Sequence, residues 1–127
     1  MKPADPRPLV LLTEGDALVG LDLSDAVEQA GYRVLGPLDT TRAALALVEQ
    51  ERPDLAVLDV VLKDGFSSEL VREFRQCGVP FLIHTEYQQD GSLANEVRAE
   101  PRLQKPACSW DVVATLDELS RARSPLR

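Results

Sequence analysis

Cysteine is scarce in this sequence. The two cysteines, Cys77 and Cys108, do not form a Cys-x-x-Cys pair, and two cysteines cannot build a disulfide framework in a chain of 127 residues. Disulfide frameworks belong to oxidising compartments, so the lack of one favours a reducing compartment. We therefore expect the protein to be cytoplasmic.

Basic residues and long apolar runs are also in short supply. Lysine and arginine number 14 against 21 aspartates and glutamates, which gives a net charge of −7. Affinity for nucleic acid and for anionic membranes comes largely from basic groups, so neither is expected as a partner. No apolar run approaches the roughly 18 residues of a membrane-spanning helix. Met1–Pro8 is proline-rich and polar, unlike the apolar stretch of a secretory signal.

The residues that are abundant are typical of one globular domain. Hydrophobic residues make up 44% and charged residues 28% of the chain, a balance that argues against disorder. A chain of this length can bury a core without disulfides or metals. We place the domain at residues 8–122 and expect flexible tails at 1–7 and 123–127.

Short apolar runs alternate along the chain with stretches of helical periodicity. The runs predict five strands, at Leu9–Thr13, Arg33–Gly36, Leu55–Leu58, Pro80–His84 and Leu103–Lys105. Helices should follow each strand, with N-cap candidates at Thr40 or Thr41, Ser67 or Ser68, and Ser109. A weak fourth helix is expected at about Ser92–Arg98. The strands are continuous apolar runs, so both sheet faces should be covered, which predicts a parallel, doubly wound α/β fold.

Polar side chains stand at the end of four of the predicted strands or directly after it. Glu14, Asp59, Thr85 and Lys105 would meet at the carboxyl edge of the sheet, where open α/β sheets place their sites. A carboxylate can attack phosphorus to form an acyl phosphate. A divalent metal held by carboxylates offsets the charge of that attack, and an ammonium can pair with the transferred oxygens. The set therefore indicates phosphoryl transfer to a carboxylate.

Over about Pro8 to Leu119 the chain resembles the receiver domain of bacterial two-component response regulators. The likeness rests on motifs in family-like order and spacing, namely Glu14-Gly15-Asp16, Leu58-Asp59-Val60, Asp64-Gly65, Thr85 and Lys105-Pro106. It implies a flavodoxin-like (βα)5 fold whose five-stranded parallel sheet has the order 2-1-3-4-5. Pro80-Phe81, Thr85 and Tyr87 are further similar to stand-alone alphaproteobacterial receivers with a Phe-Ala-Thr-Gly-type fourth strand.

The resemblance implies a role for each matched residue of the phosphoryl site. Asp59 would be the phosphoacceptor and Thr85 the switch hydroxyl. Lys105 would contact the phosphoryl group, and its bond to Pro106 is typically cis in the family. The phosphoryl group would come from a histidine kinase or a phosphotransfer protein, so the chain would be a signalling module and not an enzyme.

A Mg²⁺ site is also implied, formed by Asp59, Glu14, Asp16 and the backbone carbonyl of Val61. The family usually has two consecutive acidic residues after the first strand. Here Glu14 matches the first, Gly15 replaces the second, and Asp16 follows one position late. Gly15 sterically permits an altered turn through which Asp16 would reach the metal.

The output of such a module would be a contact with another protein. Phosphorylation would shift a pre-existing equilibrium on the face formed by the fourth helix, the fifth strand and the fifth helix. A downstream protein would bind there, and the same face allows a weak homodimer.

Two alternatives stay open. A pseudo-receiver would keep the fold and bind partners without phosphorylation. Gly15, Glu86 and Arg102 favour it, because the family usually has an acidic, a small and an aromatic residue at these positions. A small enzyme or cofactor carrier on the same topology is disfavoured, because no Gly-x-Gly-x-x-Gly follows the first strand. Val61 also stands where a dehalogenase-type phosphatase would have a second aspartate.

Two further residues attract notice. His84 is the single histidine and lies in an apolar strand, with no second metal-type ligand beside it. We expect it to be buried and hydrogen-bonded rather than a ligand or a base. Trp110 opens the last helix and is either a lid on the core or part of an exposed partner surface.

Overall fold

The computed structural model of the chain describes residues 5–86 and 100–123. The helix expected at Ser92–Arg98 lies outside these ranges. No helix within them is both long enough and apolar enough to cross a membrane.

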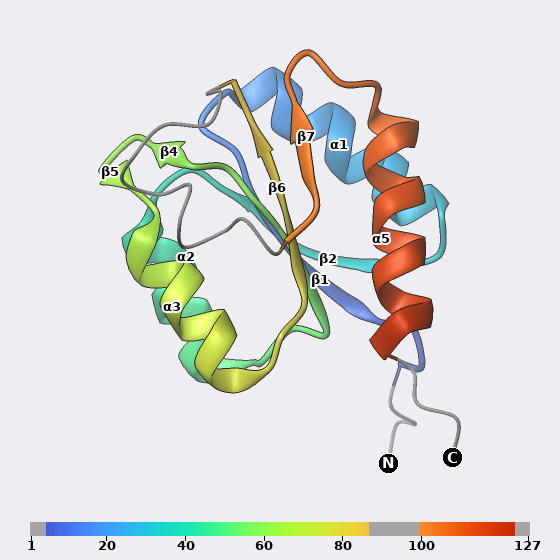
Figure 1. Ribbon diagram of the computed structural model, residues 1–127, viewed down its shortest axis with the longest axis horizontal. Helices are drawn as coiled ribbons and strands as arrows, with labels where there is room; N and C mark the ends of the chain where they lie inside the picture. The colour runs from blue at the N-terminus through green and yellow to red at the C-terminus, as the bar shows by residue number, and fades with distance from the viewer. Residues whose placement is uncertain (1–4, 87–99, 124–127) are drawn as a thin grey trace.

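A five-stranded parallel sheet forms the centre of the molecule (Figure 1). Its strands lie in the order β2-β1-β3-β6-β7, which is the predicted order 2-1-3-4-5 because β6 and β7 are the fourth and fifth strands of this sheet. The predicted fold class is therefore confirmed. The bounds are Leu9–Thr13 for β1, Arg33–Leu38 for β2, Leu55–Leu58 for β3, Phe81–Thr85 for β6 and Arg102–Gln104 for β7.

Helices cover both faces of the sheet. Figure 1 shows α1 (Ala17–Gln29) and α5 (Ser109–Arg123) on one side, and α2 (Thr41–Gln50) and α3 (Ser68–Cys77) on the other. Thr40 caps α2, since its hydroxyl accepts a hydrogen bond from the Ala43 amide at 3.1 Å. The last helix reaches Arg123, one residue past the predicted domain boundary at 122.

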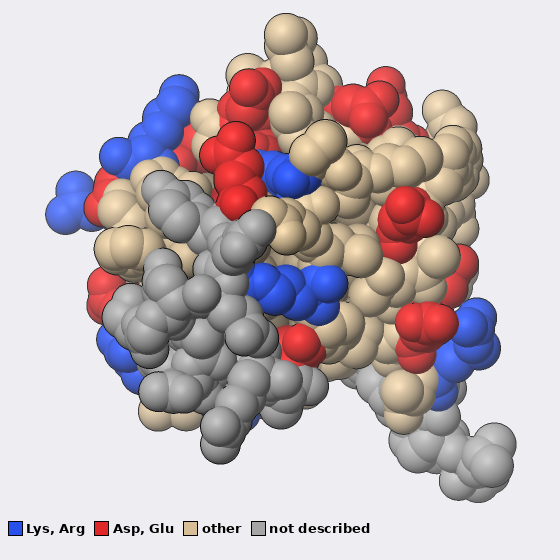
Figure 2. Space-filling view, turned by 45° about the horizontal axis from the view of Figure 1, so that its top comes forward, with Lys and Arg blue, Asp and Glu red and all other residues tan. Residues whose placement is uncertain are grey.

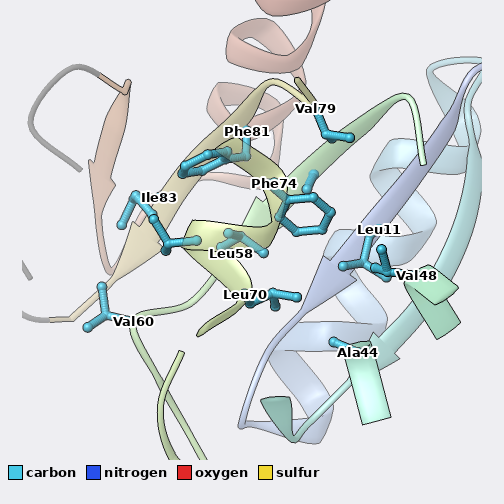
Figure 3. Close-up of a cluster of buried hydrophobic side chains, with 12 residues drawn as sticks. Leu11, Ala44, Val48, Leu58, Val60, Leu70, Phe74, Val79, Phe81 and Ile83 are labelled. Atoms are coloured by element: carbon cyan, nitrogen blue, oxygen red, sulfur yellow. The ribbon is translucent and has the colours of Figure 1, made fainter. Parts of the chain in front are cut away.

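Two apolar layers hold these helices to the sheet. Alternate residues of the buried strands point to opposite faces, so Leu11 and Ile83 join the layer under α2 and α3 while Leu12 and Leu82 join the layer under α1 and α5. Figure 3 shows the first of these layers. The rings of Phe74 and Phe81 meet there with centroids 6.2 Å apart, within the range of favourable aromatic pairs.

Strand β2 runs two residues beyond its predicted end at Gly36. The glycine has a φ of 118°, and a Cβ at this position would lie 2.6 Å from the Leu12 carbonyl oxygen. Glycine therefore lets the edge strand approach β1 closely and continue through Pro37 to Leu38. The Gly36–Pro37 peptide bond is cis.

A small antiparallel hairpin between β3 and α3 was not predicted. It pairs β4 (Val61–Leu62) with β5 (Gly65–Phe66). Asp64 at its turn accepts hydrogen bonds from the backbone amides of Thr41 and Arg42, at 2.8 and 3.1 Å. These bonds attach the segment that follows Asp59 to the start of α2.

The core assignment predicts a contrast between two phenylalanines. Phe74→Ala should lower the free energy of unfolding by about 3–5 kcal/mol, because the ring is fully buried and its removal leaves a cavity. Phe66 is 57% exposed, so Phe66→Ala should change the free energy by less than about 0.5 kcal/mol. Urea denaturation followed by circular dichroism measures both. Equal losses at the two positions would contradict this description of the core.

Candidate functional site

The predicted site residues meet at the carboxyl edge of the sheet, toward the top of Figure 1. Glu14 follows β1, Asp59 follows β3, Thr85 ends β6 and Lys105 follows β7. Glu14, Asp59 and Thr85 are all buried. The order of the strands explains this convergence, because β1, β3, β6 and β7 are neighbours in one parallel sheet.

Lys105 joins two of these residues. Its Nζ donates a hydrogen bond to Oδ2 of Asp59 at 2.8 Å and another to Oε2 of Glu14 at 2.7 Å. Oε1 of Glu14 also lies 2.7 Å from Nζ, but this contact does not have hydrogen-bond geometry. Burial by itself would lower the pKa of Lys105, but the hydrogen bonds to Asp59 and Glu14 outweigh it, and the pKa is raised. The ammonium therefore stays charged between two carboxylates.

Backbone contacts complete the surroundings of Glu14. The Asp16 amide donates to Oε2 of Glu14 at 3.0 Å. Oε1 of Glu14 is buried and has no hydrogen-bond partner among the described residues. Figure 2, which brings this edge of the molecule forward, shows acidic and basic side chains standing close together outside the grey region.

Asp16 reaches this cluster through its backbone and not through its carboxylate. Oδ1 of Asp16 accepts from the amides of Leu18 and Val19, at 2.9 and 3.1 Å, and so caps the start of α1. The carboxylate is exposed. The structure thus engages in a helix cap the carboxylate that the sequence grouped with those of Glu14 and Asp59 as a metal ligand.

The backbone carbonyl of Val61 faces the turn after β1. Its oxygen lies 3.8 Å from the position that a Cβ would take at Gly15. The structure therefore brings the carboxylates of Glu14 and Asp59 together around Lys105 and places this carbonyl beside the turn that follows Glu14.

These oxygen donors fit Mg²⁺, which is usually held by one or two carboxylates and keeps several waters. Oε1 of Glu14, which is buried and accepts no hydrogen bond among the described residues although it lies 2.7 Å from Nζ of Lys105, is consistent with this fit. Across residues 5–86 and 100–123, no three Asp, Glu, His or Cys side chains are grouped as a metal site. A cation here would depend on two carboxylates and a carbonyl.

Two buried hydroxyls contact the backbone of Asp59. The Asp59 amide donates to Oγ1 of Thr13 at 3.0 Å, and Oγ of Ser67 donates to the Asp59 carbonyl at 2.7 Å. From the sequence, Thr13 has no predicted role beyond ending its strand, and Ser67 is predicted only as a helix cap. Ser67 does occupy the N-cap position of α3, but its side chain makes no capping bond.

His84 is buried, as predicted, with Nδ1 3.9 Å from Oε1 of Glu14. Burial and then the charge of Lys105 lower its pKa to about 4, against the opposing effect of Asp59. The imidazole is therefore neutral near pH 7. Its Nε2 has no hydrogen-bond partner in the part of the chain that the structure describes, so the expected hydrogen bond is not found at this atom.

The structure also shows the Lys105–Pro106 bond, Glu86 and Trp110, which the sequence singled out. The Lys105–Pro106 peptide bond is cis, as the family resemblance implied. Glu86 is exposed and lines a cavity of about 530 Å³ together with His84 and Lys105. Trp110 is 56% exposed, so it is not a lid on the core.

Comparison with known proteins gives three informative matches, although no family model matches the chain. The KDP operon transcriptional regulatory protein KdpE of Escherichia coli is 31% identical over 118 residues, which are 91% of this chain and 52% of that protein. The signal receiver domain of a modulated diguanylate cyclase from Desulfovibrio desulfuricans is 25% identical and has a TM-score of 0.77, over 91% of this chain and 95% of that one. A two-component response regulator from Clostridium difficile is 20% identical with a TM-score of 0.82, over 94% of this chain and all (100%) of that one.

The chain spans about half the length of the curated relatives it matches, with shares of 52% to 54%. These relatives are regulatory proteins, and the solved structures that share the fold include receiver domains and response regulators. Asp59, Thr85 and Lys105 lie at the carboxyl edge of the five-stranded sheet that this chain shares with them. The chain belongs to the receiver domains of response regulators.

Proposed function

We propose that this receiver accepts a phosphoryl group on Asp59 from a histidine kinase or a phosphotransfer protein. The observation that carries the proposal is the contact of 2.8 Å between Nζ of Lys105 and Oδ2 of Asp59. It places a charged donor of hydrogen bonds on a carboxylate oxygen of the proposed nucleophile, while the backbone amide of Lys105 donates to the carbonyl of the buried Thr85 at 2.8 Å. Receiver domains generally bind Mg²⁺ at an acidic site, and the present donors suit that cation.

The transfer can be written from these residues. A carboxylate oxygen of Asp59 attacks the phosphorus of a phosphohistidine, forming an O–P bond while the P–N bond breaks. The electron pair of that bond returns to the donor imidazole, which takes up a proton. Lys105 pairs with oxygens of the transferred group, and Thr85 donates to another.

Glu14, Asp59 and the Val61 carbonyl would hold Mg²⁺, which offsets the charge of the phosphoryl oxygens when bound. Asp16 supports this set by fixing the Glu14 carboxylate with its amide, at 3.0 Å. Its carboxylate remains a proposed ligand, although its Oδ1 is engaged in the cap of α1, where it accepts two hydrogen bonds. The metal site is thus reduced relative to one with two acidic side chains after β1.

Signalling would proceed through protein contacts. The face that would change includes β7, which ends directly before Lys105, and α5, which begins after it at Ser109. We propose that a downstream protein binds this face, where a weak homodimer can also form. The regulatory activities named for the longer relatives concern those proteins and are not assigned to this chain.

A phosphorylation-independent pseudo-receiver is the second candidate. The observation that favours it is that Lys105 already pairs with both Glu14 and Asp59, while Asp16 is engaged in its cap. A site with its charges already paired can serve as a structural element. The two candidates differ in what Mg²⁺ and a phosphoryl donor do to the protein.

Incubation with acetyl phosphate separates the two candidates. The intact mass should rise by one phosphoryl group in the presence of Mg²⁺ and remain unchanged without it. Asp59→Asn removes the nucleophile at nearly the same size and should give no adduct. A wild-type protein that stays folded by circular dichroism yet gains no mass, from acetyl phosphate or from phosphohistidine donors, would leave the pseudo-receiver in place.

Removal of the Lys105 charge tests the balance between ammonium and metal. Lys105→Met leaves the Glu14 and Asp59 carboxylates close together without a counter-charge, and should lower the free energy of unfolding by up to about 3 kcal/mol. Mg²⁺ should then raise the melting temperature of Lys105→Met more than that of the wild type, because a cation restores the missing charge. Thermal unfolding with and without Mg²⁺ measures this, with Lys63→Met as a control at a surface ion pair. An equal Mg²⁺ effect on all three proteins would refute a cation site at these carboxylates.

A further inference from the structure

Asp59 lies just beyond the regular part of the sheet. Strand β3 ends at Leu58, where the last pair with β6 joins Leu58 to Ile83. On the other side, the last pair with β1 joins Val57 to Leu12. The backbone of Asp59 is therefore held by contacts other than the strand pairing, and two of those contacts come from side-chain hydroxyls.

The first hydroxyl belongs to Thr13, the last residue of β1. Its Oγ1 accepts from the Asp59 amide at 3.0 Å and lies 3.4 Å from the Val57 carbonyl, to which it donates. Thr13 is only 1% exposed. Because the same oxygen bonds both groups, the Asp59 amide is held to β1, the strand with which β3 pairs.

The second hydroxyl belongs to Ser67, at the start of α3. Its Oγ lies 2.7 Å from the Asp59 carbonyl and 3.1 Å from the Val60 carbonyl, and it is completely buried. The Ser67 amide also donates to the Val60 carbonyl, at 2.9 Å. This hydroxyl forgoes the usual capping bond and holds the peptide groups on either side of Val60.

The two contacts act on the same residue from opposite sides. Buried amides and carbonyls need partners in any protein, so hydrogen bonding alone does not imply a catalytic contribution. Here both the amide and the carbonyl of Asp59 are fixed, which sets the direction of its Cα–Cβ bond. That direction decides whether the carboxylate points along the 2.8 Å contact with Lys105.

We propose that Thr13 and Ser67 are positioning residues for phosphoryl transfer at Asp59. Their hydroxyls hold the backbone of the nucleophile so that its carboxylate faces Lys105 and an incoming phosphorus atom. The inference rests on the proposed function of Asp59. A misplacement of about 1 Å in such a group can reduce a rate by about a hundredfold.

Thr13 offers a matched pair of substitutions. Thr13→Val keeps the volume and removes the hydroxyl, whereas Thr13→Ser keeps the hydroxyl and removes a methyl group. We expect Thr13→Val to lower the rate of phosphorylation by acetyl phosphate at least about tenfold and to speed hydrogen exchange at the Asp59 amide. Thr13→Ser should remain within about threefold of the wild type in both measurements, even where it costs stability through the lost methyl group.

The rate is followed by intact mass and the exchange by NMR, at a temperature where thermal unfolding shows each protein to be folded. A purely structural role predicts that every variant that is folded reacts at the wild-type rate, whatever stability it loses. Such an unchanged rate in Thr13→Val, despite faster exchange at the Asp59 amide, would overturn the proposal.

Ser67→Ala gives an independent test if Thr13→Val does not fold. It should slow phosphorylation to a similar extent, since the Asp59 carbonyl loses its 2.7 Å partner. An unchanged rate in Ser67→Ala would count against the proposal. If the wild type itself gains no phosphoryl group, the proposed function fails and the positioning role fails with it. An adduct on the wild type with equal rates in the variants removes the positioning role alone.

Discussion

The ammonium group of Lys105 is the contact on which the organisation of the site depends. It lies within 2.8 Å of carboxylate oxygens from both Glu14 and Asp59, two side chains that are almost wholly buried. Two carboxylates this close would repel each other strongly in an apolar interior. Lys105 leaves one net negative charge on the three groups, and it links the ends of β1, β3 and β7 across the sheet.

The sheet order makes this contact available, and much of that order could be predicted from the sequence. The apolar runs at Leu9–Thr13 and Leu55–Leu58 match β1 and β3 residue for residue, because strands covered on both faces carry continuous apolar sequence. The residue directly after such a run in a parallel sheet stands at the carboxyl edge. Glu14, Asp59 and Lys105 can be grouped on that basis from the sequence alone.

Other parts of the site were beyond prediction because one residue type can serve several partners. Ser67 has the chemistry of a helix cap and stands at the cap position, yet its hydroxyl binds the Asp59 and Val60 carbonyls. Asp16 has the chemistry of a metal ligand, yet its carboxylate caps α1. Such choices depend on distances between segments far apart in the chain. The β4–β5 hairpin was missed for a related reason, since strands of two residues carry no periodic signal.

The charge on the cluster links the unusual turn after β1 to the function proposed for Asp59. A phosphoryl group on Asp59 would add negative charge and draw Lys105 toward the new oxygens. Glu14 would then lose part of its counter-charge while still buried, with Oε1 already lacking a hydrogen bond among the described residues. A cation at Glu14 and the Val61 carbonyl would restore the balance. Gly15 adds no side chain beside that carbonyl, where the family usually has a second acidic residue. Glu14 is therefore the one buried carboxylate of this turn. The demand for a cation should therefore be greater in the phosphorylated state than in the resting state, where Lys105 meets much of it.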